Sequence, residues 1–246
     1  MALLQYILLQ NNMLKKLFTF SFLLLVINTT FSQREKVLNL PSFDKPLFHY
    51  GFYLGLNNNG YKIAYKPSNI SNPNVKVESS IGFNVGLIAD LRLHDNVNLR
   101  FEPGLMSNTK TLIFDHIPGT NENIRTREVG ATYLHLPLIF KFSTNRLNNF
   151  RPYVLGGISY DYNFSSNEKN SNDNSSGEFR ATSSNFMYEI GIGVDFYLNY
   201  FKFSPSIRGV FALNNELKYD NSSPSQWTDP IDFLGTRGVF LHLSFE

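Results

Sequence analysis

The sequence predicts an all-β fold, an eight-stranded antiparallel up-and-down transmembrane β-barrel with short periplasmic turns and long extracellular loops. Three observations predict it. Eight stretches alternate their side chains with the period of two that a strand requires. Short turns and long polar loops alternate between these stretches, and one face of them contains charged residues of both signs. A membrane barrel accommodates this pattern, because its apolar face contacts lipid and its other face lines a lumen.

The composition agrees with an exported barrel. The 246 residues contain 22 basic and 20 acidic side chains, a net charge of +2 that argues against electrostatic binding of nucleic acid. The 23 phenylalanines and 13 tyrosines suit strands and membrane interfaces. There is no cysteine, so disulfides and lipid attachment to cysteine are excluded. The slightly negative mean hydropathy of −0.19 is ordinary for a barrel with a polar interior.

The N-terminal region resembles a secretory signal. Lys15 and Lys16 precede an apolar run from Leu17 to Ile27, and small residues lead up to Ser32. We therefore expect residues 1–32 to be an upstream extension and a signal peptide, with Met13 as the start and cleavage near Ser32. A buried or single-span helix is the alternative, but the apolar run is shorter than the roughly 20 residues that a span needs.

Residues 33–47 contain two prolines and no periodicity, which predicts an extended periplasmic leader, and residues 48–246 are expected to form the barrel. Long polar loops are expected near 57–80, 107–130, 165–184 and 214–236, with short turns between the other strands. Prolines at 103, 137 and 205 fall inside predicted strands and require a bulge or an unpaired position. The strands are expected near residues 48–57, 82–93, 97–106, 133–142, 150–162, 186–196, 201–211 and 238–245.

The face opposite the apolar one predicts a lumenal charge network. A barrel of eight strands is about wide enough to be filled by its own side chains. Because the charges nearly balance, we expect salt bridges to fill the lumen without an open pore, and a structural network is favoured over a transport or signalling role. The expected members are Asp90, Arg92, Arg100, Glu102, His135, Lys141, Glu189, Asp195, Lys202 and Arg208, with His242 nearby.

Catalytic, metal and cofactor sites are not expected. His116 beside Asp115, with many loop serines, is the one candidate set for nucleophilic catalysis, but no G-x-S-x-G motif frames a serine. The five histidines lack the H-x-x-x-H and H-x-H spacings of a metal site, and no G-x-G-x-x-G motif opens a helix.

Several segments, which cover about half of the mature chain in order, resemble one family. They are VLNLPSFDKPLFHYGFYLGLN, GFNVGLIADLRL, NLRFEPGL, TYLHLPLIFKFS, RPYVLGGIS, YFKFSPSIRGVFALNNEL and TRGVFLHLSFE. They resemble the PorT (also called SprT) family of Bacteroidetes outer-membrane proteins. The resemblance implies an accessory component of the type IX protein secretion system, which also supports gliding motility in some members, and it implies no catalytic residues.

The expected location is the outer membrane of a Gram-negative bacterium. The expected partners are outer-membrane lipid or lipopolysaccharide and other type IX secretion proteins, with no nucleic acid and no small-molecule substrate. Because a narrow, filled barrel cannot pass folded proteins, such a role would be scaffolding or assembly with a larger translocon. Two other classes stay open, an OmpX-like structural or adhesive barrel that acts through its extracellular loops, and a barrel enzyme.

Overall fold

The computed structural model describes residues 37–67, 74–117, 122–169, 179–219 and 225–246. The predicted signal peptide and its cleavage near Ser32 lie outside these residues. The folded unit runs from Leu38 to Glu246. Within the described ranges, no helix combines the length and the apolarity that crossing a membrane would demand.

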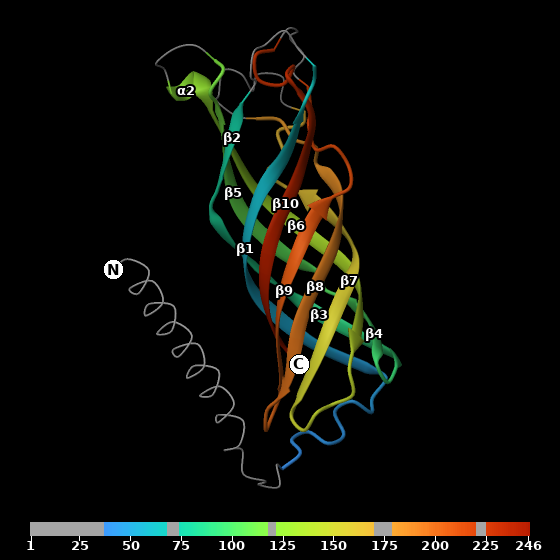
Figure 1. The fold of residues 1–246 in the computed structure, drawn as a ribbon. Coiled ribbons are helices and arrows are strands. Elements are labelled where there is room, and N and C mark those ends of the chain that lie inside the picture. The colour runs from blue at the N-terminus through green and yellow to red at the C-terminus, as the bar shows by residue number, and fades with distance from the viewer. Residues whose placement is uncertain (1–36, 68–73, 118–121, 170–178, 220–224) are drawn as a thin grey trace, which may run out of the picture. The chain divides into compact units, whose positions relative to one another are not determined.

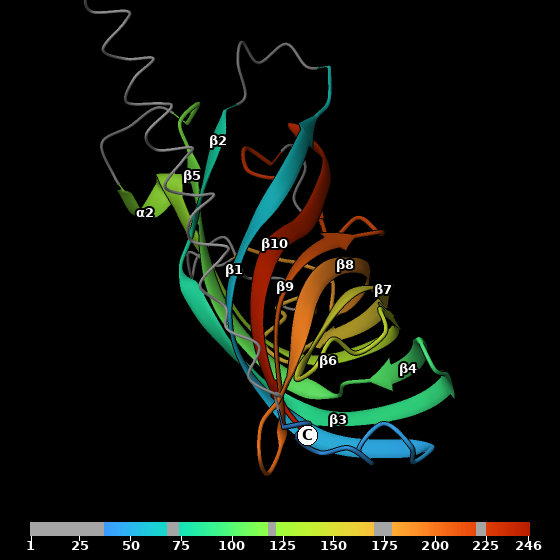
Figure 2. The ribbon, with the colours of Figure 1, turned by 60° about the horizontal axis from the view of Figure 1, so that its bottom comes forward.

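Ten β elements form one antiparallel sheet in the order β1-β10-β9-β8-β7-β6-β4-β3-β5-β2 (Figure 1). Because β1 pairs with β10 on one side and with β3 on the other, the sheet closes on itself as a barrel, seen from one end in Figure 2. The elements are β1 (Phe48–Tyr65), β2 (Val75–Ser79), β3 (Ile81–His94), β4 (Val97–Phe101), β5 (Gly104–Phe114), the short helix α2 (Glu122–Arg125), β6 (Thr126–Ser143), β7 (Phe150–Asn163), β8 (Ser184–Tyr197), β9 (Lys202–Ala212) and β10 (Ile231–Phe245).

These ten elements make eight wall strands. A single residue, Ser80, separates β2 from β3, and both pair with β5, so the two run on as one wall strand. Pro103, which has no N–H to donate, lies in the gap between β4 and β5, and both of these elements pair with β6. The predicted all-β, up-and-down barrel is therefore confirmed.

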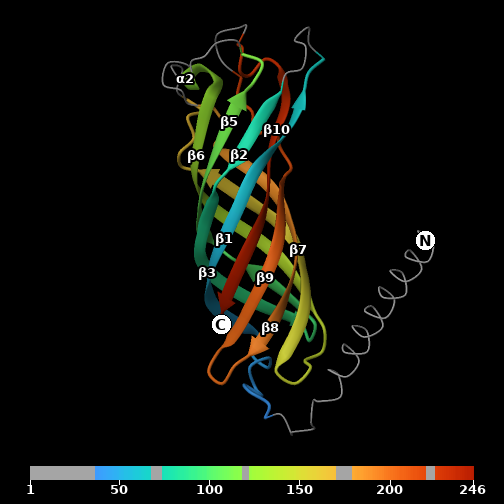
Figure 3. The same ribbon diagram turned by 60° about the vertical axis from the view of Figure 1, so that its left-hand side comes forward.

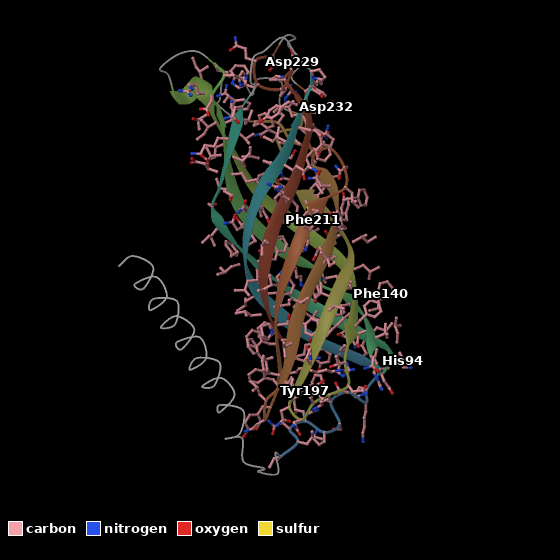
Figure 4. The ribbon with its side chains drawn as sticks, viewed as in Figure 1. His94, Phe140, Tyr197, Phe211, Asp229 and Asp232 are labelled. Atoms are coloured by element: carbon pink, nitrogen blue, oxygen red, sulfur yellow. The ribbon has the colours of Figure 1, made fainter. Side chains whose placement is uncertain are left out.

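Burial alternates along every wall strand and produces an apolar belt on the outside. Figure 4 shows Phe140 and Phe211 on this wall, between Tyr197 and His94 towards one end and Asp229 and Asp232 at the other. We call the two ends the short-turn end and the long-loop end. The belt includes Phe48, Phe52, Leu54, Phe83, Val85, Leu87, Leu105, Leu138, Phe140, Val154, Ile158, Tyr188, Ile190, Ile192, Ile207, Val239 and Leu241, all exposed.

The wall continues beyond the belt at the long-loop end, where the sequence analysis expected loops. Half of the expected 57–80 loop is strand, because β1 runs to Tyr65 and β2 follows, and β5 and β6 likewise extend into the 107–130 connection (Figure 3). Here the outward residues turn polar, as water replaces lipid outside, and many of the inward residues are apolar. The enclosed core consists of Tyr61, Val75, Leu112, Phe114, Ile117, Val129, Phe179, Leu217, Ile231 and Leu234.

Candidate functional site

The centre of the lumen is a cluster of arginine–carboxylate pairs. Arg208 donates from both terminal nitrogens to Glu102, at 2.6 and 3.2 Å. On the other side of Glu102, Arg100 places its Nε 2.9 Å from Oε1, and its Nη2 lies 3.2 Å from Glu246. All four side chains are at most 1% exposed, so each charge depends on its partners for the solvation that water would supply.

Towards the short-turn end, lysine pairs continue the network. Lys141 Nζ donates to both oxygens of Asp195 at 2.7 and 2.8 Å, and Ser204 Oγ donates to the same carboxylate at 2.7 Å. Lys202 Nζ lies 3.0 Å from Glu246. These contacts join β6, β8 and β9 to the C-terminal residue after β10, so they connect opposite sides of the barrel.

Towards the long-loop end, His135 lies between two carboxylates. Its Nδ1 lies 2.7 Å from Asp161 and its Nε2 lies 3.1 Å from Glu189, whose Oε2 is 3.7 Å from Arg208. His242 stacks on the ring of Tyr53 at a centroid distance of 4.6 Å. Both histidines are buried, so they extend the cluster of buried polar side chains towards the long-loop end.

Two apolar clusters lie among the members of the network. Ile139, Tyr153 and Leu155 pack together in the half near the short turns. Met106, Tyr133, Met187, Val210 and Phe240 form a second layer nearer the long loops. Charged pairs and apolar side chains of the described residues thus share the interior of the barrel.

The structure brings together nine of the ten residues predicted for the network. Arg92 lies apart from them, because its side chain pairs with Asp95 at the turn and donates to the Lys45 carbonyl at 3.2 Å. The period of two placed Arg92 on the inward face correctly, but at the strand end the inward face already meets water. The nine that gather are Asp90, Arg100, Glu102, His135, Lys141, Glu189, Asp195, Lys202 and Arg208.

Two members were missed. Asp161 lies on the buried face of its strand, and its pairing opposite His135 follows from the β6–β7 register. Glu246 follows the last strand. Its contact with Lys202 follows the β9–β10 register, whereas its contact with Arg100 on β4 depends on barrel closure. The lumenal charge network, as we use the name below, comprises the nine residues above with Asp161, His242 and Glu246.

His116 and Asp115 each contact a group other than the other member of the pair. His116 Nε2 lies 3.0 Å from the carbonyl oxygen of Gln226, while Asp115 accepts from Arg125 at 2.9 Å. In the ranges that the structure describes, no group of three or more potential ligands could hold a metal ion.

The described part of the leader, residues 37–47, is folded onto the short-turn end, contrary to the expected extended conformation. Arg146 donates to the carbonyls of Asn39 and Leu40, and its guanidinium lies 3.6 Å from the centre of the Tyr197 ring. Leu40 has a φ of 47°, a left-handed conformation that is costly for a side chain with a Cβ and that these hydrogen bonds hold in place. We call Asn39–Lys45 the cap.

Aromatic and acidic side chains complete the docking of the cap. Tyr197 Oη donates to Asp44 at 2.8 Å, and Phe43 stacks on His49 with a centroid distance of 4.8 Å. Lys202 Nζ, a member of the lumenal charge network, lies 4.8 Å from the Phe43 ring centre. The cap is therefore continuous with the filling of the lumen, and Figure 1 shows this blue segment at the end that carries the short turns.

A separate polar chain lies beyond the belt, near the long loops. The hydroxyl of Thr236 accepts from Lys110 Nζ at 2.9 Å and donates to Glu216 at 2.9 Å, and Lys110 lies 3.9 Å from the ring centre of Tyr61. Burial lowers the pKa of Lys110 to about 8, while burial raises the pKa of Glu216. Both shifts have the same cause, which is that charged groups lose hydration in this core.

Stability should depend on pH through Lys110. Its pKa is lower in the folded than in the unfolded chain, where it is about 10.4, so the unfolded chain binds more protons between these values and stability rises with pH there. We expect the free energy of unfolding to increase by about 1–3 kcal/mol between pH 8 and pH 10.5, an increase that Lys110→Met abolishes. Urea titrations in detergent micelles measure this, and Lys76→Met, at an exposed lysine, is the control. Identical pH profiles for wild type and Lys110→Met would contradict it.

Comparison with known proteins gives a family for this architecture. Residues 31–218 match a family model described as "Outer membrane protein beta-barrel domain". No curated protein matches the sequence. Similar solved structures include OprG of Pseudomonas aeruginosa, with 13% identity, a TM-score of 0.42 and coverage of 79% of this chain and 94% of that one. Ail of Yersinia pestis has 14% identity, a TM-score of 0.37 and coverage of 80% and 96%. The outer membrane enzyme PagL has 13% identity, a TM-score of 0.36 and coverage of 78% and 97%.

Proposed function

Because this chain belongs to the family of outer membrane protein beta-barrel domains, we propose that it is a non-enzymatic accessory component of type IX protein secretion. The protein is located in the outer membrane, where short turns of such barrels face the periplasm and long loops face outside. In this proposal the lumen is structural, and the cap with its neighbouring turns is the surface that periplasmic secretion components contact.

The docked cap is the observation that supports this role most directly. A flexible leader would lose conformational entropy on binding a partner, whereas a docked cap presents one preformed surface. Leu38 and Leu147, which adjoin the cap and the turn that holds it, are 48% and 51% exposed, so apolar area is available at this end. The filled lumen supports the same reading, because it favours assembly at a surface over transport through the barrel.

The sequence resemblance supports the assignment to type IX secretion. The cap lies within the segment VLNLPSFDKPL, one of the less generic parts of the resemblance to the PorT family. The same segment supplies Asn39, Phe43 and Asp44, which contact the barrel. A role for the cap would explain why this segment is distinctive while barrel strands resemble one another.

A secretion assay tests the proposal. Deletion of the gene should trap secreted cargo in the periplasm, and the wild-type gene should restore secretion. Arg146→Ala, which removes the hydrogen bonds to Asn39 and Leu40, should restore it poorly although the barrel still inserts, and so should deletion of residues 33–40. Replacement of the extracellular loop between Ser165 and Ser184 is the control and should restore secretion fully.

Outcomes of this assay separate the classes of function. Normal secretion in the gene deletion would refute the accessory role. Normal secretion with Arg146→Ala, at wild-type levels of inserted barrel, would refute the role of the cap. Loss of surface adhesion with the loop replacement, together with normal secretion throughout, would instead identify an OmpX-like adhesive barrel.

A further inference from the structure

The wall of the barrel contains a groove on its lipid-facing side. Its volume is about 760 Å³, and it crosses β6, β7, β8, β9 and β10. We call it the wall groove. Its lining includes Pro152, Tyr153, Val154, Gly193, Val194 and Pro205.

Two prolines interrupt the wall at the groove. Val194 on β8 is paired with Pro152 on β7, and Pro205 occupies the facing position on β9. Neither proline has an N–H to donate to the strand ladder. The β8–β9 pairs run from Gly193–Ser206 directly to Phe196–Phe203 in the same register, so the ladder skips Val194. Small side chains and a gap in the ladder together produce a depression there.

The groove has a closed floor. Gly193 has no side chain, and a Cβ at this position would lie 2.4 Å from the ring of Tyr153. That ring is only 4% exposed and has Lys141 Nζ 4.1 Å from its centre, on the side of the lumenal charge network. Ser204 and Asp195 bond across the interrupted seam at 2.7 Å. The groove is therefore a recess in the outer surface that the lumen does not enter.

The rim of the groove is part of the lipid-facing belt. Phe142, Val154, Ile192, Ile207 and Leu241 are paired in one row across five strands, and each is between 39% and 64% exposed. The other end of the groove is at Thr144, where the short turn after β6 begins, which places it in the periplasmic half of the membrane. The medium that reaches this recess is consequently the hydrocarbon of the periplasmic leaflet.

We propose that the wall groove binds one acyl chain of a phospholipid from the periplasmic leaflet. On the flat parts of the belt a lipid chain contacts the protein on one side only. In the groove it would contact a floor and two walls, and the added dispersion contacts favour retention of one lipid over exchange with the surrounding bilayer. The inference is independent of the secretion role, because it concerns the wall and not the cap.

Native mass spectrometry tests this on the purified barrel mixed with dioleoyl phosphatidylethanolamine. Wild type should retain one phospholipid under conditions that remove the surrounding lipid. Val194→Trp fills the recess and should lower the retained fraction at least tenfold. Val85→Trp is the matched control, since Val85 is a lipid-facing valine on β3 outside the groove, and it should retain the phospholipid as wild type does.

Several outcomes would overturn the proposal. A folded wild-type barrel that retains no phospholipid overturns it. Equal phospholipid retention in wild type and Val194→Trp also overturns it. So does retention of lipopolysaccharide instead of phospholipid, and so does a wild-type dimer that the Val194→Trp substitution dissociates. Heat-dependent electrophoretic mobility verifies that each variant is folded. If Val194→Trp does not fold, Val194→Leu is used instead and should lower phospholipid retention by an intermediate amount. Unchanged retention in Val194→Leu would then overturn the proposal.

Discussion

Replacing Glu102 with leucine is expected to lower the free energy of unfolding by about 3–5 kcal/mol. Glu102 accepts hydrogen bonds from Arg208 at 2.6 and 3.2 Å and lies 2.9 Å from Arg100, and all three side chains are buried. Its removal leaves two guanidinium groups in the lumen with too little negative charge to replace their hydration. Urea unfolding of the barrel in micelles or liposomes, followed by the heat-dependent shift in electrophoretic mobility, measures the change.

Two further variants test whether the charge is the cause. Glu78→Leu, at an exposed glutamate paired with Lys76, should change stability by less than about 1 kcal/mol. Glu102→Leu combined with Arg208→Met should be more stable than Glu102→Leu alone, because Arg100 keeps Glu246 as a partner. A single Glu102→Leu variant as stable as wild type would show that the network does not hold the lumen together.

Gly86→Val is expected to prevent folding or to cost about 3 kcal/mol or more. A Cβ at Gly86 would lie 2.6 Å from the ring of Tyr53 and 2.5 Å from the Pro103 carbonyl oxygen. Tyr53 is fully buried and stacks on His242, so its ring cannot move without disturbing the centre of the lumen. The yield of heat-modifiable, folded barrel after refolding into micelles reports this.

The control is the same substitution at a glycine that faces outward, Gly156 on β7. A Cβ at Gly156, which faces outward on β7, meets only the Glu189 carbonyl oxygen at 3.7 Å. Gly156→Val should therefore fold with wild-type yield. Equal yields for the two variants would mean that Tyr53 does not fill the lumen against Gly86.

Alternation was sufficient to predict the wall and its two faces. Phe83 and Leu87 are exposed on the belt while Asp90, on the same strand, is fully buried, as the period of two requires. The turn between β3 and β4 also lies where His94 and the following polar residues predicted it. These features depend on local sequence, since side-chain direction along a strand is a local property.

The rest depended on tertiary contacts that no local pattern contains. The cap is held by Arg146, which is 106 residues from Leu40 in sequence. The leader sequence on its own contains only prolines and scattered charges and does not indicate this contact. The continuation of β1 to Tyr65 was not predicted from the sequence, because the outward residues of this extension are polar. Polar outward residues are unexpected on a lipid-facing strand, but here the strand lies beyond the lipid and its outward face contacts water. Glu246 and Arg100 become neighbours only when β1 and β10 close the barrel.

The central claim, that side chains fill the lumen and function therefore resides on the surfaces, is tested most directly by solute flux. Purified barrel is inserted into liposomes, its folding and insertion are verified by heat-dependent mobility and protease protection, and swelling in a small sugar such as arabinose is recorded. The filled lumen predicts swelling no faster than that of protein-free liposomes at every protein content. Swelling that increases in proportion to the amount of inserted protein would contradict it.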